Sequence, residues 1–315
     1  MSAGHLRAFL LVGATALAGC AQIAPTPTPP PPPSNQPPQP RPEVREQSQA
    51  SLKAQAYYQR VQNTLLTQGL LRTDGGGPDT PFTAESLTRN FLRIALFQEY
   101  AETSFRLIAR ENSSFLHRWT SPVRYKVTFG ASVPMDQRAK DSRTIARYSA
   151  RLSRLTRLGF SENSSDANMH IFVVNEDERK ALGPALRAIV PGISQATVNA
   201  AVNMNRDTYC LAFAASPGNS GSIDKAIIII RGEHPDLMRR SCVHEEISQA
   251  LGLPNDSPDA RPSIFNDDSE FALLTTHDEL LLRILYDPRL RPGMKQAEAR
   301  PIVETIAAEL LGGSV

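Results

Sequence analysis

Residues 242–256 read CVHEEISQALGLPND, a pattern that predicts a helix ending near Gly252. Glu245 and Gln249 are four residues apart, so they project from the same face of that helix. Glu246 lies beside them. Because a carboxylate can act as a general base or as a metal ligand, this helix face is the first candidate for a functional site.

A third polar residue follows the helix at a fixed spacing. Gly252 comes three residues after Gln249, and Asn255 comes three residues after Gly252. The same spacing occurs in His-Glu-x-x-His-x-x-Gly-x-x-His zinc sites, where the glycine turns the chain so that a third ligand returns to the metal. The stretch Ala250–Leu253 resembles the core of that motif in matrixin-type peptidases of the metzincin clan. This resemblance implies a candidate general base, Glu246, and three candidate ligand positions, Glu245, Gln249 and Asn255.

The resemblance continues toward the C-terminus. The segment that begins at Ser263 looks like the Met-turn beneath the metal of those enzymes, with Phe265 in place of the methionine. Leu274–Tyr286 resembles their final helix, so the similarity covers roughly residues 120–290. The whole pattern is even more similar to an uncharacterised bacterial envelope family, the domain of unknown function 2927.

The candidate ligands differ from those of a zinc peptidase. Metzincins use three imidazoles, whereas the matching positions here carry one carboxylate and two amides. Zinc prefers nitrogen and sulfur, while amide and carboxylate oxygens suit calcium or magnesium. We therefore expect no zinc and no cofactor, with a weakly held divalent cation as the alternative. Three nearby carboxylates could add charge to such a site: Asp256, Asp267 and Asp268.

The histidines of the chain lack the spacing of metal ligands. His244 immediately precedes Glu245 and points off the ligand face of the expected helix, so we expect it to pack or to lie at the surface. Three further histidines have no partner at a ligand spacing and are expected to be structural: His170, His234 and His277.

Two cysteines remain in the mature chain, Cys210 and Cys242. In an oxidising compartment the simplest expectation is a disulfide between them, with two free thiols as the alternative. Such a bridge would close a loop of about 33 residues and stabilise the fold by roughly 3–4 kcal/mol in the chain-entropy model.

The N-terminus predicts export. A basic start and a short apolar run precede Leu17-Ala18-Gly19-Cys20, which resembles the bacterial lipobox. The resemblance implies a signal peptide over residues 1–19 and lipidation of Cys20, with an outer-membrane location favoured; a plain signal peptide is the alternative. Residues 20–43 form a proline-rich linker that cannot build a packed core.

The rest of the chain predicts an α/β (α+β) fold of the zincin type. We expect an N-terminal helical region over 44–118, with one helix spanning residues 84–110, and a metzincin-like domain over 119–315. Its predicted strands are 123–129, 169–174, 209–215 and 225–230, and a long helix begins at Asp136. A mixed sheet with packed helices follows from this order, with the helix of the 242–256 stretch leading into a small C-terminal helical subdomain.

Composition narrows the possible partners. The net charge is only +2 and the charges of both signs are interleaved, so no nucleic-acid partner is expected. Three functions remain. The first is a non-catalytic envelope lipoprotein that binds a peptide or a cell-wall component. The second is a divergent metal-dependent hydrolase with Glu246 as its base. The third is an envelope tethering or assembly factor, anchored to the membrane through Cys20.

Overall fold

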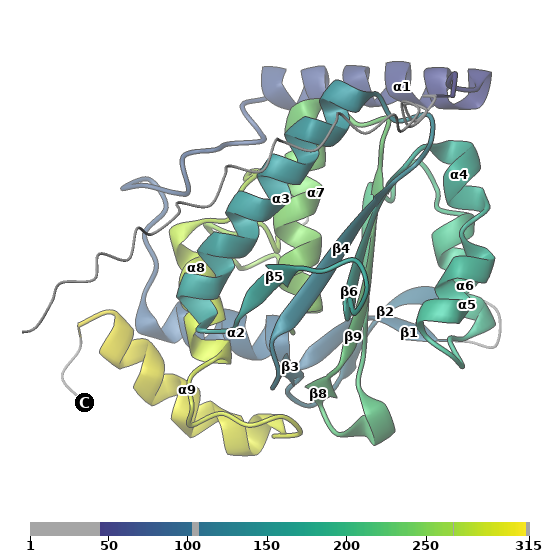
Figure 1. The fold of residues 1–315 in the computed structure, drawn as a ribbon. Helices are drawn as coiled ribbons and strands as arrows, with labels where there is room; N and C mark the ends of the chain where they lie inside the picture. Colours follow the sequence, from purple (N-terminus) through teal and green to yellow (C-terminus); the bar gives the residue numbers. More distant parts are fainter. Residues whose placement is uncertain (1–44, 103–106, 267, 313–315) are drawn as a thin grey trace, which may run out of the picture. The chain divides into compact units, whose positions relative to one another are not determined.

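The centre of the fold is a five-stranded mixed sheet with the strand order β5-β4-β6-β9-β7 (Figure 1). The strands are β4 (Val123–Phe129), β5 (Phe160–Glu162), β6 (Met169–Val174), β7 (Cys210–Ala215) and β9 (Lys225–Arg231). Strands β5, β4, β6 and β9 run parallel to one another, and β7 pairs antiparallel with β9 at the edge. The predicted strands and the mixed sheet are confirmed.

This structure is a computed structural model that describes residues 45–102, 107–266 and 268–312. These residues belong to one compact unit, Glu43–Val315. The predicted signal peptide, the lipidation site Cys20, the linker over 20–43 and Asp267 lie outside the described residues. Within the described part, every helix is too short or too polar to cross a lipid bilayer.

Helices cover both faces of the sheet, as Figure 1 shows. One face carries α3 (Met135–Thr156), α7 (Asp236–Ala250) and α8 (Thr276–Leu285), and the other carries α4 (Glu176–Lys180), α5 (Gly183–Ile189) and α6 (Gln195–Val202). Strand β9 explains this arrangement, because Ile228 and Ile230 belong to the core under α3 and α7, whereas Ile227 and Ile229 belong to the core under α5 and α6. A strand that is apolar on both faces must be covered on both.

The predicted helix over 84–110 is wrong in its second half. Helix α2 (Ala84–Ala95) ends early, and an antiparallel hairpin of β1 (Phe97–Glu102) and β2 (Leu107–Ser113) follows it. The end of α2 is held from far along the chain: the backbone N–H of Asn255 donates to Ile94 O, and its side-chain amide donates to Arg93 O. Because this cap comes from residue 255, no local pattern could reveal it.

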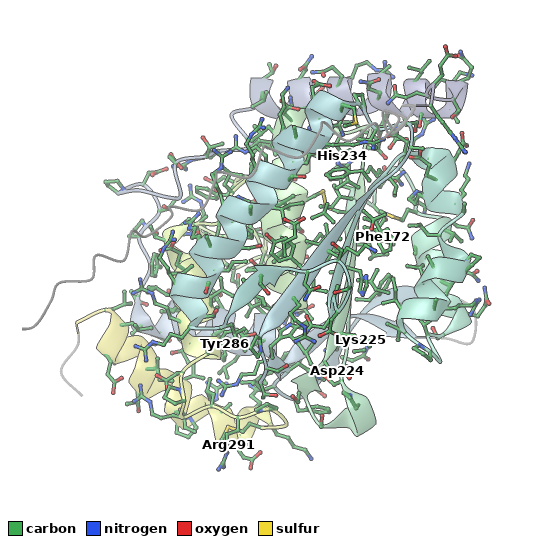
Figure 2. All side chains as sticks on the ribbon, viewed as in Figure 1. Phe172, Asp224, Lys225, His234, Tyr286 and Arg291 are labelled. Carbon is green, nitrogen blue, oxygen red and sulfur yellow. A yellow bond between two sulfur atoms is a disulfide. The ribbon has the colours of Figure 1, made fainter. Side chains whose placement is uncertain are left out.

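The remaining elements pack around this framework. They are α1 (Gln49–Thr67), α9 (Gln296–Leu310), the short parallel pair β3 (Arg118–Trp119) and β8 (Ser222–Ile223), and the single turn η1 (Pro217–Asn219). Helix α1 is fixed to the framework beside His234 (Figure 2), whose ring lies 4.4 Å from the ring of Tyr58. Ser51 adds a hydrogen bond of 2.7 Å to Glu233 Oε1.

Candidate functional site

A cleft of about 700 Å³ runs between helix α7 and the edge strand β7. Helix α7 contributes one stripe of residues spaced by four positions, Ser241, Glu245 and Gln249, all of which are partly exposed. Glu246 lines the cleft from a deeper position and is only 4% exposed. The predicted shared face of Glu245 and Gln249, with Glu246 beside it, is therefore present.

Strand β7 forms a second wall of the cleft along its whole length. The strand lies at the edge of the sheet, and among the described residues only β9 pairs with it. The segment that joins α5 to α6 adds Ile193 and Ser194 to the lining, and α6 itself adds Thr197. An unpaired strand edge in a groove can pair with an added chain, because its outward N–H and C=O groups lack sheet partners.

Asn255 does not reach this cleft, which corrects its prediction as the third ligand. Its side chain is 3% exposed, it is absent from the lining, and its amide donates to Arg93 O at 3.1 Å. The next residue, Asp256, lines the cleft instead. The spacing of the zinc motif thus brings two of its three ligand positions together and commits the third to capping α2.

Gly252 turns the chain at the end of α7. Its φ of +119° lies in a region that L side chains rarely adopt. A Cβ at this position would lie 2.0 Å from His117 O, so the glycine is also required by a close backbone approach. The predicted sharp turn after the helix is present. Tyr286 (Figure 2) supports it by donating its hydroxyl to Leu251 O at 2.8 Å.

The predicted turn at Ser263 and Phe265 lies next to the cleft. Ile264 and Asn266 line the cleft, while Phe265 is fully buried in the core. The turn is held by Asp278 in the first turn of α8, whose carboxylate accepts from the hydroxyl of Ser263 at 2.5 Å and from the N–H of Ile264 at 3.0 Å.

The Cys210–Cys242 disulfide joins β7 to α7 and is confirmed, with a Cα–Cα distance of 5.8 Å. It links the two main walls of the cleft, since both cysteines line it. A cross-link of this loop size stabilises the folded chain by roughly 3–4 kcal/mol in the chain-entropy model.

The carboxylates of Glu245 and Glu246 lie within 4.8 Å of each other and of Cys210 Sγ. The sulfur is not an available thiolate, because it is already bonded to Cys242. Two carboxylates and the nearby amide of Gln249 form an oxygen donor set that suits a hard divalent cation better than zinc. The arrangement is therefore a weak candidate for a calcium or magnesium site.

The sequence does not single out His117, whereas Asp256 was expected as a carboxylate near the site and does line the cleft. His117 lines the cleft next to the Gly252 turn, and its ring nitrogens lie 3.2 Å from Ser216 Oγ and 3.4 Å from Ser114 Oγ. Burial lowers its pKa, which favours the neutral imidazole. No spacing in the sequence connects this histidine to α7, so tertiary structure alone brings it to the cleft.

The histidines that the sequence analysis assigned no metal role lie in the core, on a strand or away from the cleft. His277 is fully buried against the ring of Phe82, and His234 is fully buried below α1. His170 lies half-buried on β6. His244 points away from the cleft and stacks on Tyr148 at a centroid distance of 4.0 Å.

His244 is expected to make the fold sensitive to acid. Burial lowers its pKa to about 3, with Arg151 and Arg240 as further causes. Its Nδ1 accepts from the Leu274 N–H at 3.0 Å, so the folded state needs the neutral ring. Below the unfolded pKa of about 6.5, the unfolded chain binds a proton that the folded chain excludes. Stability is therefore complete above pH ~6.5 and falls as the pH drops toward ~3.

The measurement is urea unfolding at pH 7 and pH 5, with His244→Asn as the comparison. Asparagine can accept the Leu274 hydrogen bond through its side-chain oxygen but does not titrate. The native chain should lose about 2 kcal/mol more than the variant between these two pH values. Burial raises the pKa of Glu233 and of Asp141, which acts in the opposite direction in both proteins and cancels in the comparison. Equal losses in both proteins would contradict the assignment.

Comparison with known proteins adds one match. Searches of curated proteins and of solved structures return no significant similarity. The model of one family, described as "Protein of unknown function (DUF2927)", matches residues 84–305, which is well over half of the chain. The match includes every residue that lines the cleft except Leu65 and Leu71. The chain therefore belongs to the DUF2927 family.

Proposed function

We propose that this chain is a lipid-anchored protein of the bacterial cell envelope whose metzincin-like cleft binds a peptide, or a peptide-bearing wall component, without zinc-dependent hydrolysis. The observation that carries the proposal is the cleft of about 700 Å³ along the outer edge of β7, which pairs with no other strand of the described residues. An extended peptide fits such a groove because its backbone can hydrogen-bond to a sheet edge while alternate side chains enter the pockets.

The charges in the cleft favour a basic ligand. Glu245, Glu246 and Asp256 all line it, and no arginine or lysine does so among the described residues. Carboxylates in a partly enclosed groove attract ammonium or guanidinium groups and disfavour anionic ones. A peptide with a lysine, an arginine or a free amino group near its centre is thus the expected ligand.

The donor set argues against a zinc peptidase. None of the three ligand positions carries histidine, Asn255 is used to cap α2, and Cys210 is bonded to Cys242. Zinc hydrolysis requires a Lewis acid strong enough to lower the pKa of bound water, which weak oxygen donors with a hard cation supply poorly. The lack of such a centre supports binding rather than cleavage.

A divergent hydrolase is the second candidate, favoured by the adjacent carboxylates of Glu245 and Glu246. In that case a divalent cation would be held by Glu245 and Gln249, and Glu246 would act as the general base. Mass spectrometry of peptide substrates in the presence of calcium, magnesium or zinc distinguishes the two. Cleavage that disappears in Glu246→Gln would replace the binding proposal with this one.

The anchor rests on the sequence of the N-terminus. Leu17–Cys20 supports lipidation, and eleven prolines between residues 25 and 42 support an extended spacer of about 50 Å. A spacer of this kind would hold the cleft away from the membrane, toward the periplasmic side where wall peptides occur. A purely tethering role remains the third hypothesis, and shortening residues 25–42 tests it through the resulting envelope phenotype.

Fluorescence anisotropy tests the binding proposal. The probes are a lysine-containing extended peptide, an acidic peptide of the same length, and muropeptides released from digested cell wall. We expect the lysine peptide or the muropeptides to bind, and Glu245→Lys to weaken that binding about tenfold. Glu304→Lys, an equal charge change on the exposed face of α9, is the matched control and should bind normally.

Hydrogen exchange identifies the wall that the ligand uses. The amides of β7 should exchange more slowly when ligand is bound, while those of the central strand β6 should not change. The proposal is wrong if no probe binds the native chain, or if binding survives Glu245→Lys without change and leaves the exchange of β7 unaltered.

A further inference from the structure

A second cavity, of about 520 Å³, lies on the other side of α7, between that helix and α3. Its α3 wall carries four cationic residues at successive turns, Lys140, Arg143, Arg147 and Arg151. Its α7 wall adds Arg239 and Arg240. We call this cavity the α3–α7 groove. It faces away from the β7 cleft, because Glu245 and Gln249 line that cleft and His244 lines the groove.

The charges of the α3–α7 groove are only partly balanced. Six cationic side chains and two carboxylates line it, and Glu279 pairs with one of the cations, Arg151, at 2.8 Å. Asp141 is occupied by Arg239, whose Nε lies 2.8 Å and 2.9 Å from its two oxygens. The net charge of this region is therefore about three positive in a partly enclosed space.

Three of the cations have no acidic partner. Among the residues that the structure describes, no carboxylate lies within ion-pair distance of Arg143, Arg147 or Arg240, and all three are exposed. Arg143 and Arg147 are four residues apart on α3, so they project from the same helix face, and Arg240 faces them from α7. Like charges held this close repel one another, which is relieved when an anion binds between them.

His244 supplies a further donor at the floor of the groove. The residue is 8% exposed, and its Nδ1 accepts from the Leu274 N–H, which leaves the proton on Nε2. Within the described part of the chain no protein group accepts from this Nε2–H, although the ring lines the groove. This nitrogen is open to the solvent of the groove, where water or a ligand can accept its hydrogen bond.

We propose that the α3–α7 groove is a binding site for a phosphate group. The guanidinium groups of Arg143, Arg147 and Arg240 bind the phosphate oxygens, and the Nε2–H of His244 donates to one of them. A phosphate matches this set better than a carboxylate does, because it offers more acceptor oxygens and up to two negative charges, and arginine forks bind it in paired hydrogen bonds. The site is independent of the β7 cleft and does not rest on the peptide-binding proposal.

Phosphate groups of this kind occur on soluble metabolites and on membrane headgroups, and two measurements on the full chain distinguish these sources. Calorimetric titration with pyrophosphate measures binding of a free phosphate anion. Flotation with phosphatidylcholine vesicles, with and without phosphatidylglycerol, measures attraction to an anionic headgroup beyond any effect of the N-terminus. We expect binding in at least one of the two, weakened by added salt.

The test variant is Arg143→Glu with Arg147→Glu. Both side chains are exposed and unpaired, so the fold should persist, and we expect binding to weaken about a hundredfold, or about tenfold for each arginine. The matched control is Arg89→Glu with Arg154→Glu, which makes the same charge change at exposed helical positions outside the groove. This control should weaken binding less than threefold.

A magnetic resonance readout reports on His244 itself. The imidazole C–H signals of His244, assigned by their absence in His244→Asn, should shift when pyrophosphate is added and should not shift in the double arginine variant. The proposal is overturned if neither probe binds the native chain, if the two double variants lose binding equally, or if the His244 signals are unaffected by a probe that binds.

Discussion

Gly252→Ala is expected to lower the free energy of unfolding by more than about 3 kcal/mol and to leave little folded protein at 37 °C. A Cβ on residue 252 would lie 2.0 Å from His117 O and 2.9 Å from His117 C. Both are backbone atoms, so the clash can be relieved only if the end of α7 or the segment before β3 moves. The φ of +119° would add backbone strain to this steric clash.

Gly192→Ala is the matched control for this experiment. Gly192 also has a positive φ, +86°, but a Cβ there would meet nothing within 4 Å. It should therefore cost only the roughly 1 kcal/mol of an unfavourable backbone conformation. Urea unfolding followed by circular dichroism measures both variants. If the two unfold at the same urea concentration, the close approach of residues 117 and 252 is not what requires glycine.

The Gly252 turn illustrates what the sequence could predict about this fold. Strands such as β4 and β9, helix α7 and the shared face of Glu245 and Gln249 all follow from periodicity, because each is encoded by neighbouring residues. The disulfide follows from a count of the cysteines that remain after the lipobox. The strands, the helix and its shared face are encoded by neighbouring residues, and the disulfide has only one possible pair of cysteines.

The predictions from sequence fail where residues that are distant in the chain determine the local structure. The cap on α2 comes from Asn255, so the helix ends at Ala95 although the sequence after it does not exclude helix. The same contact removes Asn255 from the cleft, and His117 takes a position that no spacing indicates. The spacing of a motif predicts which side chains share one face of a helix. The path of the loop after the helix depends on tertiary contacts, which the spacing does not reveal.

The start of α8 shows the same limit at the scale of one residue. Two overlapping pairs could form a capping box there, Thr276 with Glu279 and Thr275 with Asp278, and the structure uses the second. Both pairs satisfy the local pattern. The choice is made by the turn at Ser263 and Ile264, whose donors bind Asp278 and not Glu279. Glu279 instead pairs with Arg151 on α3.

Asp278 is the second position at which a single substitution should have a large effect. Its side chain is fully buried and accepts from the Ser263 hydroxyl, the Ile264 N–H and the Thr275 N–H. Removal of the carboxylate leaves these three buried donors without their acceptor, and each such loss costs about 1–3 kcal/mol. We expect Asp278→Ala to lower the free energy of unfolding by about 4 kcal/mol, and Asp278→Asn, which keeps the shape and one acceptor oxygen, by about 2 kcal/mol.

Asp136→Ala is the control for the Asp278 variants. It measures the stabilisation that any acidic residue gives in the first turn of a helix, without the buried hydrogen bonds of Asp278. Asp136 also lies in the first turn of a helix, α3, but is exposed, so its loss should cost less than about 1 kcal/mol. Because Ile264 lines the cleft, Asp278→Asn should also weaken ligand binding while the protein remains folded, whereas Asp136→Ala should not. An Asp278→Asn variant as stable as the Asp136→Ala control would mean that the turn beneath the cleft is held by apolar packing around Phe265 and not by the buried carboxylate.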